Sequence, residues 1–429
     1  MLRTIGAPRT ASAALLVFIL AFAGCSGSGS GSNSTSSGTA GATSGSNAAA
    51  GNIIKIGADL PISGADASDG VPTKLGVELA IIDANKQNLV PGFTLQSNIL
   101  DDAVNGVHNP SQGAKNVQSF ASDDAVLGIV GPFNSNVAKA EIPLTNSLGI
   151  ALISPATTNP DLTKGPRALE LRTTNPQMIT FFRVCATDDI QGPVGADYAY
   201  NDRHLRKAYL IDDNETYGRG VADAWGAQFT NDGGTVLAHD HITKGQQDFH
   251  ALLTRAAGAG PDVVFYGGVT ANGGGLIRKQ MSESGIGNVA YFGADGVRND
   301  QFLTDAGATA DNVYATVAAV NASTIPAAKQ FLTDYQAQFN QPVGSYSAAG
   351  YTAAMVLIKA IGLASKADGG KMPTRAQVLS ELRSIKSFQS IMGPFAFDAN
   401  GDTTNKIISI WGAQKDKWVF LTQRKFAAK

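Results

Sequence analysis

The sequence predicts an α/β protein built from two doubly wound lobes, each with a parallel sheet covered by helices. Short apolar runs alternate with amphipathic stretches from Ile53 onward, which is the rhythm of strand–helix units in parallel sheets. This rhythm runs once up to Arg172 and then starts again. A chain of 429 residues, 43% apolar and 16% charged, is also long and apolar enough to bury the cores of two domains.

Residues 1–25 have the layout of an export signal and are left out of the fold prediction. Arg3 and Arg9 precede an apolar segment, Ala11 to Gly24, that is short for a membrane span. The ending "FAGC" resembles the bacterial lipoprotein processing box, in which cleavage precedes a cysteine that is then acylated. We therefore expect Cys25 to be a lipid anchor. An ordinary signal peptide or an uncleaved anchor remains the alternative, because Phe22 departs from the usual aliphatic residue.

Residues 26–51 are rich in serine and glycine and carry no charge, which predicts a flexible tether. A lipid-anchored domain needs such a spacer to stand clear of a membrane. The chain has 2 cysteines, so Cys185 has no partner for an intrachain disulfide if Cys25 is acylated. The role of Cys185 is left open.

The first run of elements alternates strands and helices in the order expected for a doubly wound lobe. In its first helix, Leu75, Leu79 and Ile82 share one face. The predicted strands are 53–60, 93–102, 125–131 and 150–155, and the predicted helices are 73–85, 112–122 and 136–149.

The second run opens on a largely helical segment, 182–202, and then repeats the same alternation. Its predicted strands are 207–213, 235–242, 262–268 and 289–295, and its predicted helices are 218–234, 248–260 and 275–285. Paired glycines close the helix that ends at Gly234.

Ligands of open parallel sheets bind beyond the carboxyl ends of the strands. Two such segments lie in each lobe: "GPFNSN" and "SPATTN" in the first, and "GGVTANGGG" and "GADG" in the second. A ligand held by all four segments would lie between the lobes.

Signatures of catalysis, nucleotide binding and metal binding are scarce. The sequence contains no GxSxG, HExxH or Walker motif, and "GRGVAD" lacks the third glycine of a dinucleotide fingerprint. His239 and His241 flank Asp240 on one strand and could in principle hold a metal, but with no third ligand nearby we favour solvated strand residues. We therefore predict no catalytic residue, no cofactor and no metal. A net charge of −2 without a basic block also argues against nucleic acid.

Each candidate binding group also has a plainer explanation. The hydroxyls of "SPATTN" could simply complete a turn or cap a helix, and Ser135 could be a helix N-cap. Hydroxyl-rich corners at helix N-termini are equally suited to a carboxylate. Asp295 is either a loop carboxylate or the partner of an ammonium group, and Tyr217 is either a core residue or an aromatic wall.

The segment "GPFNSNVAKAEIPLTNSLGIALISPATTNPDLT" is very similar to the core of the branched-chain amino acid-binding proteins, the type I substrate-binding proteins of ABC importers. Further similar segments are "ILDDAVNGVHNPSQGAKNVQ", "LRTTNP", "DDNETYGRG", "VVFYGG" and "MGPFAFDANGD". The resemblance covers Ile53 to Lys429, and the pair GPxxSxxAxA and SPxxT is fairly specific.

The resemblance implies two Rossmann-like doubly wound lobes joined by three crossing hinge segments, the type I periplasmic binding protein fold. We place the crossings near residues 172–175, 313–320 and 392–405. The expected lobe 1 is 52–173 plus 318–393, and the expected lobe 2 is 174–317 plus 394–429. A ligand would bridge the lobes and close the hinge.

The resemblance also implies roles for five residues. Ser135 would hold a ligand carboxylate, and Thr158 would contact both the carboxylate and the ammonium. Ala156 would offer its carbonyl oxygen to the ammonium, and Asp295 would pair with it. Tyr217 matches the family's tyrosine before "YG". An amino-acid zwitterion is the ligand that such charge-assisted hydrogen bonds suit.

Two positions depart from relatives that bind leucine or isoleucine. Asp69 in lobe 1 and Val269 in lobe 2 align where those relatives often have an aromatic wall. Because an unpaired buried carboxylate disfavours a bare aliphatic side chain, Asp69 favours a polar or cationic ligand. Asn134 and Thr157, which adjoin the motif residues, are further candidates for ligand contacts.

The resulting expectation is an exported, monomeric lipoprotein on the extracytoplasmic face of a bacterial membrane, which captures an amino acid or related small polar ligand for an ABC importer. Its expected partners are the ligand, ABC permease subunits and, through the lipid alone, the membrane. One alternative is a sensor or receptor component that uses the same closure. Another is a ligand such as an amide, urea or a small aromatic acid. An enzyme is not expected.

Overall fold

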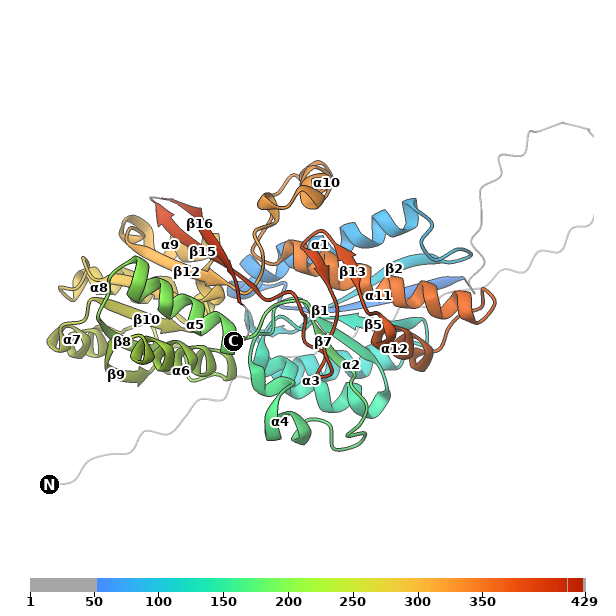
Figure 1. Cartoon of the computed structure of the whole chain (residues 1–429), viewed down its shortest axis with the longest axis horizontal. Helices are drawn as coiled ribbons and strands as arrows, with labels where there is room; N and C mark the ends of the chain where they lie inside the picture. The colour runs from blue at the N-terminus through green and yellow to red at the C-terminus, as the bar shows by residue number, and fades with distance from the viewer. Residues whose placement is uncertain (1–51, 415, 427–429) are drawn as a thin grey trace, which may run out of the picture. The chain divides into compact units, whose positions relative to one another are not determined.

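The computed structural model describes residues 52–414 and 416–426, which form two main β-sheets flanked by helices (Figure 1). The predicted export signal, Cys25 and the tether lie outside the described residues. The α/β fold class with two doubly wound parallel sheets is confirmed, and each sheet is described below with the helices that cover it.

The first sheet is entirely parallel and has the strand order β2-β1-β5-β6-β7. Its strands are β1 (Ile53–Leu60), β2 (Thr94–Asp101), β5 (Val126–Val130), β6 (Ala151–Ser154) and β7 (Phe181–Arg183). One face contacts α1 (Ala67–Lys86), α11 (Ser347–Ala367) and α12 (Arg375–Ser384), and the other contacts α2 (Pro110–Ala121) and α3 (Ser135–Leu148). α10 (Lys329–Phe339) packs beside α1, and α4 (Gly165–Glu170) follows β6.

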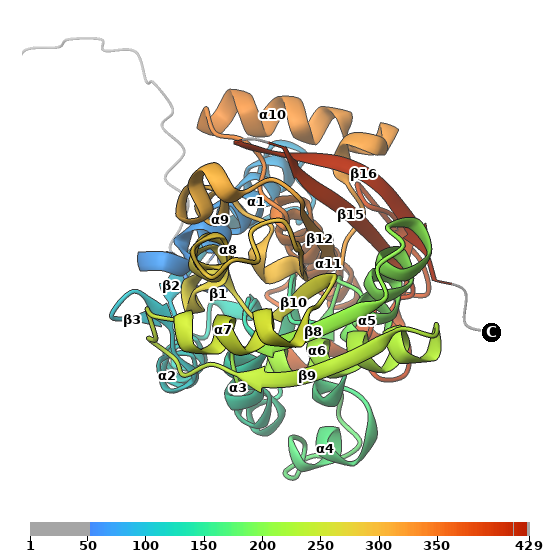
Figure 2. The same ribbon diagram turned by 90° about the vertical axis from the view of Figure 1, so that its left-hand side faces the viewer.

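The second sheet has the order β16-β15-β12-β11-β10-β8-β9, and Figure 2 faces the lobe that contains it. The strands are β8 (Lys207–Asp212), β9 (Thr235–His241), β10 (Val263–Gly267), β11 (Ala290–Gly293), β12 (Val313–Val317), β15 (Ile407–Gln414) and β16 (Lys417–Lys425). β8 to β12 run parallel, whereas β15 and β16 are antiparallel additions at the β12 edge. The helices are α5 (Asp188–Asp197), α6 (Thr216–Asn231), α7 (His250–Ala259), α8 (Gly274–Glu283) and α9 (Asp300–Ala306).

Two short antiparallel pairs complete the strands. They are β3 (Ala103–Val104) with β4 (Val107–His108), and β13 (Phe388–Ser390) with β14 (Gly393–Phe395).

Local sequence explains why these elements form where they do. β5, β6, β10 and β11 are buried along their whole length, as strands covered on both faces require, and their sequences are apolar apart from Ser154 at the end of β6. α2 begins where the side chain of Asn109 accepts a hydrogen bond from the Gln112 N–H, with Pro110 in its first turn. α3 ends at Gly149, whose φ of 65° is the left-handed conformation that glycine adopts without strain.

α11 is long and apolar enough to cross a membrane by length and composition. In the fold, 72% of its most apolar window is buried, and the helix packs against α1 and the first sheet. The apolar surface of α11 is therefore accounted for by the core of the first lobe.

The chain passes between the sheets at positions that differ partly from the prediction. The first crossing was expected at 172–175, but the later strand β7 still pairs with β6, and its buried Phe181 and Phe182 belong to the first lobe. The chain therefore leaves the first sheet after Arg183. The second crossing begins at Ala318, because residues 313–317 form β12 of the second sheet. The third lies between β14 and β15.

The strand order reverses between β1 and β5 in the first sheet and between β8 and β10 in the second. Such switch points create the crevices in which doubly wound proteins bind ligands. The four segments singled out in the sequence follow β5, β6, β10 and β11, at the carboxyl edges of the two sheets.

Candidate functional site

The carboxyl edges of the two sheets contact each other through hydrogen bonds between side chains and backbone. The Asn159 amide donates to the carbonyl oxygen of Thr216 at 2.7 Å, and the Asn299 amide donates to Asp69 Oδ2 at 2.7 Å. The Tyr346 hydroxyl, at the start of α11, donates to Asp295 Oδ2 at 2.9 Å. These contacts join elements of the first lobe to elements of the second, so the structure shows the lobes closed on one another.

Asp295 lies at the centre of this contact, directly after β11. Gln191 Nε2 and the Tyr217 hydroxyl donate to its Oδ1, the latter at 2.8 Å, and Tyr346 donates to its Oδ2. Burial raises the pKa of Asp295, and the three donors oppose that rise. The carboxylate is therefore held in a fixed orientation in a water-poor site, which suits it to pair with an ammonium group.

A second carboxylate, Asp188, shares this buried space and was not a candidate from the sequence. It is the first residue of α5 and is fully buried, and no described group forms a well-aligned hydrogen bond with either of its oxygens. Burial raises its pKa first and the charge of Asp295 second, while the facing Thr158 hydroxyl and the Arg183 charge lower it. Two carboxylates whose charges interact in a buried site repel each other, and a cation bound beside them would relieve that repulsion.

In the loop after β6, some hydroxyl groups shape the turn and others remain available to a ligand. Ser154 Oγ accepts hydrogen bonds from the N–H groups of Ala156 and Thr157, at 3.2 and 2.9 Å, and donates to the Pro132 carbonyl at 2.7 Å. Ser154 therefore only shapes the turn. In contrast, the buried Thr157 hydroxyl has no hydrogen-bond partner among the residues that the structure describes, and the buried Thr158 hydroxyl faces Asp188 without a well-aligned hydrogen bond.

The start of α3 contributes two further candidates. Asn134, not Ser135, is the N-cap, and its side chain does not cap the helix, so the N-cap interpretation of Ser135 is wrong. Asn134 Oδ1 is buried without a described partner. Ser135 is the first helical residue, and its Oγ accepts only a long hydrogen bond, 3.4 Å, from the Asn159 N–H. Both side chains are therefore free to bind a ligand.

Asp69 and Val269, the two positions that differ from relatives that bind leucine or isoleucine, have different surroundings. Asp69, in the first turn of α1, is half-buried as a residue, but its carboxylate is surrounded by protein. Burial raises the pKa of Asp69, and the charges of Asp66 and Asp295 raise it further. The hydrogen bond from Asn299 lowers it. Val269 is buried after β10 and its N–H donates to Asp213. The structure therefore places a third carboxylate close enough to Asp295 for their charges to interact.

Arg298, whose side chain is largely enclosed by protein although the residue is partly exposed, is a cation close to Asp69. Burial lowers the pKa of Arg298 to about 10, while Asp300 and Asp69 raise it. Its guanidinium carbon lies 4.0 Å from the ring centre of Trp411, and its Nη1 donates to Ser345 at 3.3 Å. Arg298 compensates part of the charge of Asp69, and the buried Arg183 does the same for Asp188, whereas Asp295 is held by neutral hydrogen-bond donors.

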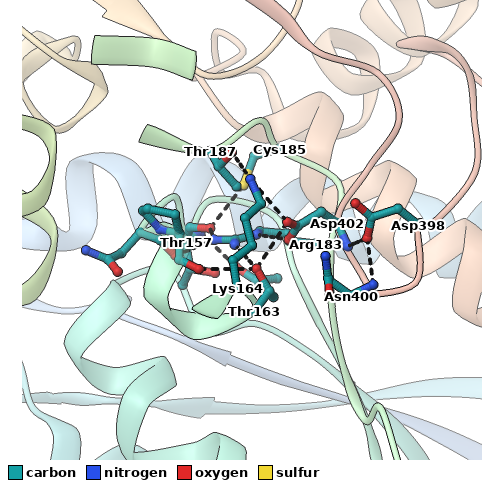
Figure 3. A network of polar contacts seen from close by, with 12 residues as sticks. Thr157, Thr163, Lys164, Arg183, Cys185, Thr187, Asp398, Asn400 and Asp402 are labelled. Atoms are coloured by element: carbon teal, nitrogen blue, oxygen red, sulfur yellow. Dashed lines mark hydrogen bonds and ion pairs between the residues drawn. The ribbon is translucent and has the colours of Figure 1, made fainter. Parts of the chain in front are cut away.

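Arg183, at the end of β7, anchors the loop after β6 to the third crossing (Figure 3). Its fully buried guanidinium donates to Asp402 Oδ1 at 2.6 Å and to the hydroxyl of Thr163. Nη1 also donates to the carbonyl oxygens of Thr157 and Asn159 at 2.9 and 2.8 Å. This single side chain fixes the backbone on both sides of Thr158.

Two neighbours extend this network. The Lys164 ammonium reaches the Thr187 hydroxyl at 3.1 Å and Asp189 at 2.9 Å, and Asp402 lies 3.6 Å away (Figure 3). Cys185 Sγ donates to the Thr157 carbonyl at 3.4 Å, and burial raises the pKa of its thiol. Cys185 is thus an unreactive buried thiol that helps position the loop after β6.

A buried histidine clasp also links the lobes. His108, in β4, contacts Asp66 of its own lobe at 2.8 Å and Glu215 of the second lobe at 2.7 Å through its two ring nitrogens. Burial alone would lower the pKa of His108, but the two carboxylates raise it to about 10. Burial would raise the pKa of Glu215, but His108 and Lys244 lower it to about 2. The clasp is therefore an ion pair at neutral pH.

We expect the His108→Gln substitution to cost stability in a pH-dependent way. Because the folded pKa of His108 is raised from 6.5 to about 10, its contribution is full below pH 6.5 and is lost as the pH rises through 10. The difference in unfolding free energy between wild type and variant should therefore shrink over that interval. Urea denaturation at several pH values measures this difference. A difference that stays constant with pH would show that His108 does not form this ion pair.

Three of the predicted site residues meet around the buried carboxylates, and three further contributors were not predicted from the sequence. Thr158, Tyr217 and Asp295 are brought together, and Asp188 and Gln191 join them from α5. The segment 182–202, which contains both residues, was predicted only to be largely helical. No local pattern in the sequence indicated a role for Tyr346, because its contact with Asp295 joins residues that are 51 positions apart and lie in different lobes.

Comparison with known proteins places the chain among binding proteins. A family model described as "Periplasmic binding protein" matches residues 53–414. The Leu/Ile/Val-binding protein homolog 3 of Brucella melitensis is 30% identical over 327 residues, which cover 76% of this chain and 82% of that protein.

Two solved structures share the fold. The branched-chain amino acid transporter substrate binding protein LivJ of Streptococcus pneumoniae, in complex with isoleucine, has a TM-score of 0.74 at 23% identity and covers 87% of this chain and 99% of its own. The solute binding protein of an ABC transporter from Rhodopseudomonas palustris, in complex with 3,4-dihydroxy benzoic acid, has a TM-score of 0.71 at 21% identity, with coverage of 87% and 97%.

Proposed function

Because the chain belongs to the periplasmic binding protein family, we propose that it captures a small ligand bearing an ammonium group between its two lobes. An amino acid or a related polar amine is the ligand class. The bound form delivers this ligand to the permease subunits of an ABC importer, and the protein acts as a monomer. Cys25, acylated, holds it at the extracytoplasmic face of the membrane, and loss of palmitate labelling in a Cys25→Ser variant tests the anchor.

The observation that carries the ligand class is the pair of buried carboxylates, Asp188 and Asp295. The charge of Asp295 adds to burial in raising the pKa of Asp188, and the pKa of Tyr217 is raised by burial and then by the charges of Asp295 and Asp188. An ammonium group placed here would relieve this repulsion and donate hydrogen bonds to the carboxylates. A lone carboxylate ligand would increase the repulsion instead.

The remaining groups fit the other end of an amino acid. The Thr158 and Thr157 hydroxyls, Asn134 and Ser135 lie at the corners after β5 and β6, where the N-terminus of α3 favours negative charge. We propose that Ser135 and Thr158 bind the ligand carboxylate and that the Ala156 carbonyl and Tyr217 complete the ammonium site. Asp69 and Val269 then border the ligand side chain, and Asp69 favours a side chain with a polar or cationic end.

A thermal-shift screen tests the ligand class directly. The full chain is first unfolded and refolded to remove any bound ligand. Its melting temperature is then measured with cationic, polar and aliphatic amino acids, diamines, amides, urea, benzoate and 3,4-dihydroxybenzoate. A ligand at 100 times its Kd stabilises the folded state by about 2.7 kcal/mol. We expect shifts with ammonium-bearing ligands, largest for those with a second polar or cationic group. A shift with the aromatic acids alone would overturn the cationic ligand class while leaving the fold assignment intact.

Transport is tested separately from binding. Deleting the gene should abolish uptake of the ligand that the screen identifies, and the wild-type gene should restore it. If the deletion strain still takes up the ligand but no longer shows a cellular response to it, the closed form is recognised by a sensor protein. The importer part of the proposal is then wrong.

A further inference from the structure

His239 and His241 acquire in the fold the third ligand that they lack in the sequence. Both lie on β9, two residues apart, so their side chains leave the same face of the strand. β8 runs parallel beside it, with Asp212 opposite His241 in the register. His239 Nε2 and His241 Nδ1 lie 2.7 and 2.8 Å from the same atom, Asp212 Oδ2.

From this geometry we propose that Asp212, His239 and His241 bind a divalent transition-metal cation of the Zn²⁺ type at the carboxyl ends of β8 and β9. The three ligand atoms lie within 4.8 Å of one another. None of these residues belongs to the proposed ligand cleft, so the site is additional to it.

The ligand chemistry selects the class of cation. Two imidazole nitrogens and one carboxylate oxygen suit Zn²⁺, Ni²⁺ or Cu²⁺, whereas Mg²⁺ and Ca²⁺ require mostly oxygen ligands. At metal–ligand distances of about 2.0–2.2 Å, tetrahedral ligand atoms are roughly 3.4 Å apart. The two contacts to Asp212 must therefore lengthen by about 0.6 Å. The side chains of His239 and His241, which are 24% and 45% exposed, have room for this adjustment.

Groups beyond the three ligands fix their orientation. Asp212 Oδ1 accepts a hydrogen bond from the Asn214 N–H at 2.7 Å, which leaves Oδ2 for the cation. The other ring nitrogen of His239, Nδ1, faces Asp223 Oδ1 at 3.6 Å. Metal-bound histidines commonly direct their second nitrogen to such a carboxylate. The exposure of His241 also provides a path of entry from solvent.

Protons compete with the cation for the same nitrogens. Without a cation, each histidine donates an N–H to Asp212, and these hydrogen bonds satisfy all three groups. Binding moves the proton of His239 to Nδ1, beside Asp223, and that of His241 to its other nitrogen. The cation can therefore bind only when both ligand nitrogens are free of protons.

The test uses the untagged full chain, stripped with a chelator, and Zn²⁺ as the probe. Isothermal titration calorimetry should show one Zn²⁺ per chain, and Co²⁺ should give the visible absorption bands of a low-symmetry site. Asp212 is fully buried, so its substitution risks unfolding, and the exposed histidines carry the test instead. We expect His239→Gln and His241→Gln each to weaken Zn²⁺ at least tenfold while circular dichroism stays unchanged.

His250→Gln is the matched control. His250 also contacts two acids, Asp248 at 2.7 Å and Glu283 at 2.9 Å, but through opposite ring nitrogens, so its ligands do not converge on one point. This variant should bind Zn²⁺ as the wild type does. Absence of stoichiometric binding, or equal affinity in wild type and both histidine variants, would overturn the proposal.

Discussion

Replacing Arg183 with leucine is expected to lower the free energy of unfolding by about 3–5 kcal/mol, the range for breaking a buried ion pair. The guanidinium is fully buried, and four groups accept its hydrogen bonds: Asp402, Thr163, and the carbonyls of Thr157 and Asn159. Leucine leaves the Asp402 charge and these carbonyls without their partner. Urea denaturation followed by circular dichroism measures the loss.

The chain offers a matched surface control for this prediction. Arg167 pairs with Asp161 at 2.9 Å, but its side chain is 74% exposed, so Arg167→Leu should cost at most about 1 kcal/mol. Adding Asp402→Leu to Arg183→Leu should recover part of the loss, because the unpaired buried charge is then removed. If Arg183→Leu costs no more than Arg167→Leu, the network does not hold the crossing segments.

The second large effect is expected in the cleft. Asp188→Asn and Asp295→Asn should each weaken the ligand found in the screen by about 2–5 kcal/mol, which is the range for truncating one partner of a buried charge pair. At about 1.4 kcal/mol per tenfold change, this loss amounts to a factor of 30 or more in Kd. Isothermal titration calorimetry measures it. Asp189→Asn is the control. Asp189 adjoins Asp188, but its side chain is 47% exposed and pairs with Lys164, so this variant should bind the ligand as the wild type does.

The same pair of carboxylates sets the pH dependence of binding. The pKa values of Asp188 and Asp295 are raised, mainly by burial, so both groups take up protons at a higher pH than an ordinary aspartate. Protonation removes the charge that attracts the ammonium group. Affinity should therefore fall as the pH is lowered toward these raised values, and the fall should begin above the usual range of aspartate. A neutral amide as ligand would show no such fall, which would separate the two ligand classes.

The regular elements could be read from the sequence because their causes are local. The continuous apolar run of β10 predicts a buried strand, and the amphipathic stretch 112–122 predicts α2 to within two residues of its start at Pro110, without reference to the rest of the chain. The motif resemblance similarly pointed to Thr158, Tyr217 and Asp295, which the fold brings together. The first crossing was misplaced because β7 has only three residues, and its pairing with β6 depends on a distant partner.

The sequence by itself determined the main strands and helices up to residue 295 and the two-lobed class, because periodicity is a property of neighbouring residues, and its resemblance to a known family pointed to Thr158, Tyr217 and Asp295. Only the tertiary structure decided which distant groups share a buried space. It set Asp188 against Asp295, linked His108 to Glu215, and placed Asp212 between two histidines that stand 27 and 29 residues away. Charge interaction and burial depend on distance in space, so no local pattern in the chain could reveal them.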